Sequence, residues 1–149
     1  MRLNDKKCAG DSNRLVGWIS MAIGAGTGLI MGLWSFNGPM PPPEWLGEYA
    51  DVSRRLARLG HIAFFGLGIL NVLLADELST DRIGYTARRV ASATMNFGNI
   101  FLPLTLFAAA AHHPLKYLLP VPAIAVSVAL VVAAYGLCRN VGCCRREDT

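Results

Sequence analysis

Three histidines are the side chains of this sequence best suited to bind a cofactor. His61 stands at the start of the apolar run LGHIAFFGLGILN, while His112 and His113 close a second run, NFGNIFLPLTLFAAAAHHP. Imidazole nitrogens are common ligands of haem iron and of transition metals. His61 and His113 are therefore candidate ligands of a b-type haem or a transition metal, and His112 replaces His113 if the helix boundary lies slightly elsewhere.

The spacing around these histidines is helical. Two series alternate steps of three and four residues: Ala57, His61, Phe64, Gly68, Asn71 and Ala75; and Asn96, Asn99, Pro103, Leu106, Ala110 and His113. Each series keeps to one face of a helix. If the two helices are antiparallel neighbours, Asn71 comes level with Asn96 or Asn99, and His61 comes within about two turns of His113, taking about 1.5 Å per residue.

Two kinds of role compete for these residues. Neighbouring helices pack about 8–10 Å apart, which is tight for a haem and better suited to a bare metal ion. In that case Glu48, or alternatively Glu44 or Asp51, from the loop before the first series, could add a carboxylate oxygen to His61 and His113. The structural alternative makes the histidines interfacial imidazoles bonded to carbonyls, and makes Asn71, Asn96 and Asn99 interhelical hydrogen-bonding residues that set register.

The composition indicates which elements must position these side chains. Hydrophobic residues make up 53% of the 149 positions, mean hydropathy is +0.39, and only 16% of residues are charged. A bilayer core of about 30 Å needs about 20 apolar residues per helix. Four segments satisfy this requirement: 15–36, 56–75, 90–111 and 117–137. The sequence therefore predicts an all-α integral membrane four-helix bundle, a single domain over 15–137.

The charges outside these segments predict an orientation. Ten Lys and Arg residues fall on the side of the N-terminus, namely Arg2, Lys6, Lys7, Arg14, Arg82, Arg88, Arg89, Arg139, Arg145 and Arg146, and four fall on the other side, namely Arg54, Arg55, Arg58 and Lys116. Because positive residues accumulate in cytoplasmic loops, both termini are predicted to be cytoplasmic. The basic tail 1–14 and the Cys/Arg-rich tail 138–149 then flank the domain in a bacterial inner membrane, and the pI of about 9.1 needs no nucleic-acid partner to explain it.

The outer loop 37–55 contains a further helical pattern. After the proline run, Trp45, Leu46, Tyr49, Val52 and Leu56 recur at helical spacing among charged residues. This pattern predicts a short amphipathic helix lying in the membrane interface, anchored by Trp45 and Tyr49. The helix is expected to bend into the second span near Gly60.

The first span carries a glycine pattern typical of close helix packing. Gly24, Gly28 and Gly32 repeat the G-x-x-x-G spacing, which removes side chains from one stripe and lets another backbone approach. All ten acidic residues are expected in tails or loops, so proton-coupled transport through an intramembrane carboxylate is not favoured. No serine has the G-x-S-x-G context of a hydrolase, and the glycines lack the lysine of a P-loop.

Two functions remain. The leading hypothesis is a small multi-pass membrane protein that serves as a non-catalytic accessory or structural subunit, contacting the lipid bilayer and other membrane-protein subunits or further copies of itself. The alternative is a b-type haem or metal-binding electron-transfer protein with its site at the outer membrane face. The two hypotheses differ in the expected effect of His61→Ala, which removes a cofactor in one case and weakens folding or assembly in the other.

Overall fold

The computed structural model describes residues 2–35, 38–48, 51–80 and 82–147, and this part of the chain contains helices and no strand. The long helices are α1 (Arg2–Gly32), α2 (Val52–Ser79), α3 (Tyr85–Ala111) and α4 (Pro120–Glu147), and the two 3-10 elements are η1 (Glu44–Leu46) and η2 (His113–Leu118).

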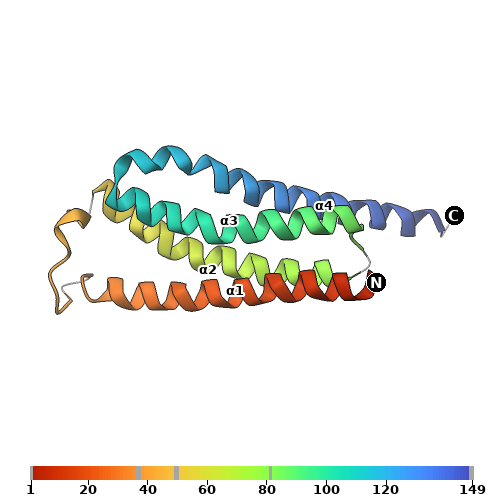
Figure 1. Ribbon diagram of the computed structural model, residues 1–149, viewed down its shortest axis with the longest axis horizontal. Coiled ribbons are helices and arrows are strands. Elements are labelled where there is room, and N and C mark those ends of the chain that lie inside the picture. The colour runs from red at the N-terminus through yellow and green to blue at the C-terminus, as the bar shows by residue number, and fades with distance from the viewer. Residues whose placement is uncertain (1, 36–37, 49–50, 81, 148–149) are drawn as a thin grey trace.

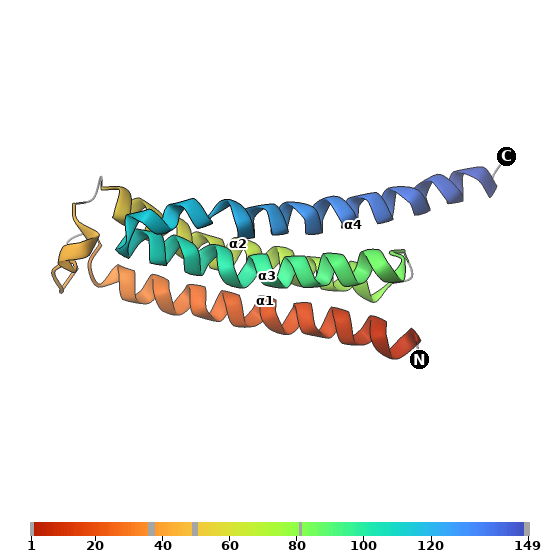
Figure 2. The ribbon, with the colours of Figure 1, turned by 45° about the horizontal axis from the view of Figure 1, so that its top comes forward.

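The four long helices lie side by side along one axis (Figures 1 and 2). α1 packs mainly against α2 and also contacts α3, α2 packs against α3, and α4 packs mainly against α3. Both chain ends and the α2–α3 connection lie at one end of the molecule, while η1 and η2 lie at the other. α2 and α3 therefore form the centre, with α1 and α4 on the flanks.

All four helices are long and apolar enough to cross a membrane. The candidate spans are Cys8–Gly32, Val52–Ser79, Tyr85–Ala111 and His113–Arg139, with mean hydropathies of 1.6, 1.7, 1.3 and 2.3. Many large apolar side chains on these helices are exposed, such as Leu29 at 76% and Val131 at 67%. The prediction of an all-helical chain with four helices long and apolar enough to span a membrane is confirmed for the described residues, and their apolar surface fits contact with a lipid bilayer.

The helix ends differ from the predicted spans in both directions. α1 ends at Gly32, before the predicted end at 36, and α4 begins at Pro120, after the predicted start at 117, whereas other ends extend further than predicted. α1 begins at Arg2, so most of the region expected as an N-terminal tail forms its first turns, and α4 likewise continues to Glu147. Asp11, Asp76 and Glu77, expected in tails or loops, consequently belong to helices. The Asp76 carboxylate accepts a hydrogen bond of 2.6 Å from Arg14, an exposed ion pair between α2 and α1.

The outer loop differs from the amphipathic helix expected there. In the loop between α1 and α2, helical structure is limited among the described residues to the single turn η1, which contains Trp45. Tyr49 lies outside those residues. Gly47 has a positive φ of 61°, a conformation that ends the turn and that side chains disfavour. α2 starts afresh at Val52 and continues through Gly60 without a break.

Two apolar clusters hold the bundle together. The larger one joins residues of α2, α3 and α4 with Ile83 of the α2–α3 loop: Leu67, Leu74, Leu78, Ile83, Ala91, Met95, Val126, Ala129 and Ala133. The smaller one joins Leu46 of η1 to Ala57 and Ala110, near the opposite end. On α1, in contrast, the positions that face α2 include small and polar residues such as Gly17, Ser20 and Gly24.

Candidate functional site

His61 bonds to α1. Its Nδ1 lies 3.0 Å from the carbonyl oxygen of Gly24 and 3.3 Å from Oγ1 of Thr27, while the Thr27 hydroxyl lies 2.9 Å from the same carbonyl. A carbonyl only accepts hydrogen bonds, so Nδ1 carries the proton and donates it. Its ring also meets Phe65 edge-on at 5.5 Å between centroids. The His61 side chain therefore links α2 to the C-terminal half of α1.

The glycine pattern of α1 makes room for this imidazole. A Cβ on Gly28 would lie 2.5 Å from Cε1 of His61, and a Cβ on Gly24 would lie 2.9 Å from the ring of Phe65. These two members of the predicted stripe thus receive aromatic rings from α2. The third, Gly32, has no atom within 4 Å of the corresponding position.

His113 has a different partner. Its Nε2 lies 3.2 Å from Oγ of Ser53, in the first turn of α2. Ser53 precedes His61 by eight residues, a distance of about 12 Å along the helix. His112 is the exposed residue at the C-terminal end of α3. The structure thus gives the two candidate ligands separate partners at different levels of α2.

The carboxylate proposed as a third ligand lies in the exposed outer loop. The backbone N–H of Glu48 donates a 2.8 Å hydrogen bond to the Asp51 carboxylate, which stabilises the turn before α2. Within the described residues, no three His, Cys, Asp or Glu side chains gather into a set that could hold a metal ion. His61 and His113 bond instead to Gly24 and Ser53, and their role as ligands stays a prediction.

Three asparagines form a hydrogen-bonded ring across three helices. Nδ2 of Asn13 on α1 donates to Oδ1 of Asn71 on α2 at 2.5 Å, and Nδ2 of Asn71 donates to Oδ1 of Asn96 on α3 at 2.9 Å. Nδ2 of Asn96 lies 3.4 Å from Oδ1 of Asn13, which also accepts from the Ser92 hydroxyl. Each amide thus donates to one neighbour and accepts from the other, and Asn13 and Asn71 are fully buried.

A second buried polar contact joins the same helices nearer their middle. Oγ of Ser20 lies 2.9 Å from the carbonyl oxygen of Phe64 and 2.9 Å from Oδ1 of Asn99. One hydroxyl proton serves only one of these acceptors, and Nδ2 of Asn99 has no described partner. Exchanging the amide atoms of Asn99 lets its nitrogen donate to Ser20 while Ser20 donates to Phe64, the better-satisfied arrangement. Asn99 and Ser20 then pair α3 with α1.

The sequence predicts three of the five residues described in this polar interface. Asn71, Asn96 and Asn99 were singled out, but their α1 partners Asn13 and Ser20 were not. The missed signal is the spacing of α1 itself, where a set of mostly small or polar residues alternates steps of three and four: Gly10, Asn13, Gly17, Ser20, Gly24, Thr27 and Met31. The sequence gives no sign of the role of Asn13, because this residue lies in a stretch of charged residues typical of a solvated tail.

Known proteins offer no guide to the role of these contacts. Comparison of the chain with protein-family models, with curated proteins and with solved structures finds no match.

Proposed function

We propose that this chain is a non-catalytic accessory or structural subunit of a membrane complex. The observation that carries the proposal is the use of its interior polar groups. His61, Asn13, Asn71 and Asn96 all bond from one helix of the bundle to another. Such hydrogen bonds fix helix register, each contributing about 0.6 kcal/mol and at most about 2 kcal/mol. The residues best suited to chemistry thus stabilise a scaffold.

The outer faces of the flanking helices support a role in assembly. Of the most apolar part of each span, 17% of residues are buried in α1 and 22% in α4, against 39% in both α2 and α3. On α4, Ile124, Val128, Val131 and Tyr135 are exposed at alternating steps of four, three and four. We assign this face of α4 to contact with a transmembrane helix of a partner subunit, because α4 packs mainly against α3 alone.

The proposed setting is a bacterial inner membrane with both termini in the cytoplasm. The excess of Lys and Arg on the side of the termini supports this orientation. The short helix expected in the interface is reduced to the η1 turn, where the exposed indole of Trp45 remains suited to the boundary between lipid and water.

Two measurements on the membrane-embedded protein test this function. The first is an optical spectrum with metal analysis of the wild type and of His61→Ala, after mild purification that retains cofactors. The second is cross-linking in the native membrane from a photoreactive residue at Val131 on α4, with a matched position at Ile62, exposed on α2. We expect a colourless, metal-free protein, with one discrete cross-linked product from Val131 and none from Ile62.

The alternative electron-transfer function has its own signature. A Soret band or stoichiometric metal in the wild type that is lost from His61→Ala would overturn the accessory role and make His61 a ligand through its free Nε2. Cross-linking to lipid alone from both positions would also contradict a subunit role. A product of twice the chain mass would identify the partner as a second copy.

A further inference from the structure

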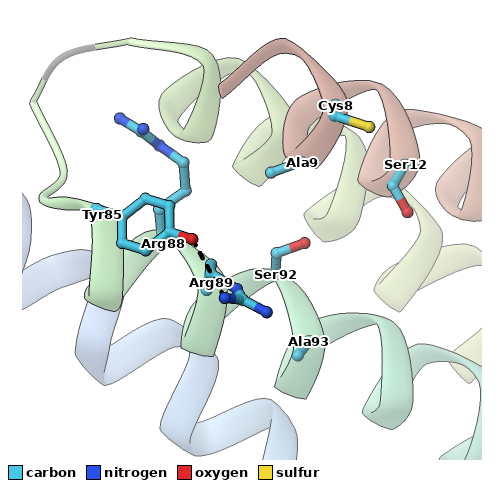
Figure 3. Close-up of a pocket in the computed structure, with 8 residues that line it drawn as sticks. All are labelled: Cys8, Ala9, Ser12, Tyr85, Arg88, Arg89, Ser92 and Ala93. Atoms are coloured by element: carbon cyan, nitrogen blue, oxygen red, sulfur yellow. Dashed lines mark hydrogen bonds between the residues drawn. The ribbon is translucent and has the colours of Figure 1, made fainter. Parts of the chain in front are cut away.

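A second polar feature lies away from the histidines, at the end of the bundle that carries the termini. A pocket of about 430 Å³ opens between the first turns of α3 and the N-terminal part of α1 (Figure 3). Its polar lining consists of Tyr85, Arg88, Arg89 and Ser92 from α3 and of Cys8 and Ser12 from α1. None of the described residues that line it is acidic, so the pocket is positively charged.

Arg88 is a buried cation whose charge the described neighbours do not neutralise. Its side chain is 4% exposed, and Nη2 donates hydrogen bonds of 2.7 and 2.8 Å to the carbonyl oxygens of Thr80 and Ile83. Its Nε is buried and has no described partner. Carbonyl dipoles satisfy donors but leave the net charge in place, and a buried charge without a counter-ion is costly. An anion in the adjoining pocket would lower that cost.

Arg89 adds a second charge at the pocket surface. Nη1 of this residue donates to the phenolic oxygen of Tyr85 at 3.2 Å, which fixes one side of the guanidinium, as Figure 3 shows. The α3 helix begins beside it at Tyr85, after Gly84, which supplies no side-chain cap. The positive end of the helix dipole therefore adds to the field of the two arginines.

We propose that this pocket binds a phosphate-bearing group. Guanidinium groups match the tetrahedral oxygens of a phosphate, and the hydroxyl of Ser12, exposed at the pocket, offers a further donor. The arginines lie at the first turns of a candidate membrane span, the level at which lipid phosphates are concentrated. The ligand is either an anionic lipid headgroup or free phosphate, and both present the same group to Arg89. Arg88, whose guanidinium points into the α2–α3 loop in Figure 3, adds its positive charge beside the pocket. This inference is independent of the accessory role.

The test uses native mass spectrometry of the detergent-solubilised full chain with added phosphatidylglycerol or phosphatidylcholine. The variant Arg89→Gln removes one pocket charge, and Arg139→Gln removes an equal charge at an exposed position of α4 outside the pocket. We expect phosphatidylglycerol to bind in preference to phosphatidylcholine. Its affinity should fall about fivefold in Arg89→Gln, the effect of one basic residue at a membrane surface, and remain unchanged in Arg139→Gln.

A second variant distinguishes a loss of lipid binding from damage to the fold. Ser12→Asp places a carboxylate at an exposed position of the pocket, where it can still accept the 3.4 Å contact from Asn96. It should weaken phosphatidylglycerol binding at an unchanged melting temperature. Competition with millimolar inorganic phosphate separates the two sources: free phosphate displaces the lipid if it is the ligand, and does not if the lipid headgroup is preferred.

Two results would overturn the proposal. Equal losses of lipid affinity in Arg89→Gln and Arg139→Gln would show attraction to the overall charge of this end of the molecule and no built site. Equal binding of phosphatidylglycerol and phosphatidylcholine, together with no effect of inorganic phosphate on the melting temperature, would show that the pocket takes no phosphate.

Discussion

At the scale of single residues, the amide ring of Asn13, Asn71 and Asn96 shows how polar side chains can hold membrane helices together. An amide placed in hydrocarbon must find a partner, and here each finds two on two other helices. A closed ring has one relative register of α1, α2 and α3 in which all its bonds form. It therefore specifies register more than it adds stability.

Removing one amide tests the ring. Asn71→Ala takes away the acceptor of Asn13 and the donor to Asn96, leaving both amides short of one buried partner. We expect the free energy of unfolding in detergent to fall by about 1–2 kcal/mol. A double-mutant cycle with Asn13→Ala should give a coupling of about 0.6–1.7 kcal/mol.

Ser127→Ala, which removes an exposed hydrogen bond within α4, is the control and should change the free energy of unfolding by less than about 0.5 kcal/mol. Strict additivity of the Asn13 and Asn71 variants would contradict the ring.

The sequence could predict some of these partnerships and not others. The level of Asn71 relative to Asn96 follows from helical rise and antiparallel neighbours, and the structure joins the two by a hydrogen bond. The direction of His61 does not follow in this way, because a helix in the centre of a bundle has two neighbours. His61 lies against α1, where Gly28 provides space that a spacing argument over α2 and α3 alone could not take into account.

At the scale of elements, the close contact between α1 and α2 depends on glycine facing glycine. A Cβ on Gly17 would lie 2.7 Å from the carbonyl oxygen of Gly68, and a Cβ on Gly68 would lie 2.9 Å from that of Gly17. Gly10 similarly faces the backbone of Ala75. The helices approach until backbone meets backbone, which is how small residues promote packing where lipid supplies no hydrophobic driving force.

A pair of glycine substitutions tests this contact. Gly17→Ala forces α1 away from a backbone atom that cannot rotate aside, whereas Gly26→Ala adds a methyl group where no atom lies within 4 Å. We expect Gly17→Ala to lower the free energy of unfolding by about 1–3 kcal/mol through overpacking. Gly26→Ala should leave stability unchanged or raise it by up to about 1 kcal/mol through helix propensity. Equal effects in thermal unfolding would indicate that helix propensity, and not interhelical distance, governs this face.

The elements themselves were predictable to different degrees. Each candidate span contains enough apolar residues to be predicted from composition alone. Composition predicts only the apolar part of a helix, however, and does not predict the residues at which the helix begins and ends. The continuation of α1 through its first polar turns depends on contacts such as Gly10 with Ala75 and Asn13 with Asn71, which only the packed structure reveals.

At the scale of the whole molecule, the two ends of the bundle differ in what they present to their surroundings. The end with both termini carries the basic pocket at Arg88 and Arg89 and the exposed thiols of Cys8 and Cys138. At the other end, the guanidinium of Arg54 donates to the carbonyl oxygen of Trp34 at 3.0 Å. The excess of Lys and Arg lies at the end that carries the termini. The positive-inside rule therefore predicts that this end faces the cytoplasm.

Cysteine accessibility tests this insertion directly. In a variant without native cysteines, single thiols are restored at Cys8 or Cys138, both exposed near the termini, or introduced by Lys116→Cys, exposed in η2 at the opposite end. With the chain in a bacterial inner membrane, we expect a membrane-impermeant maleimide to label Lys116→Cys in intact spheroplasts, and to label Cys8 and Cys138 only after the membrane is opened. Labelling of Cys8 and Cys138 from opposite sides would contradict an even number of spans. Labelling of both in intact spheroplasts would reverse the orientation and place the basic pocket on the outer face.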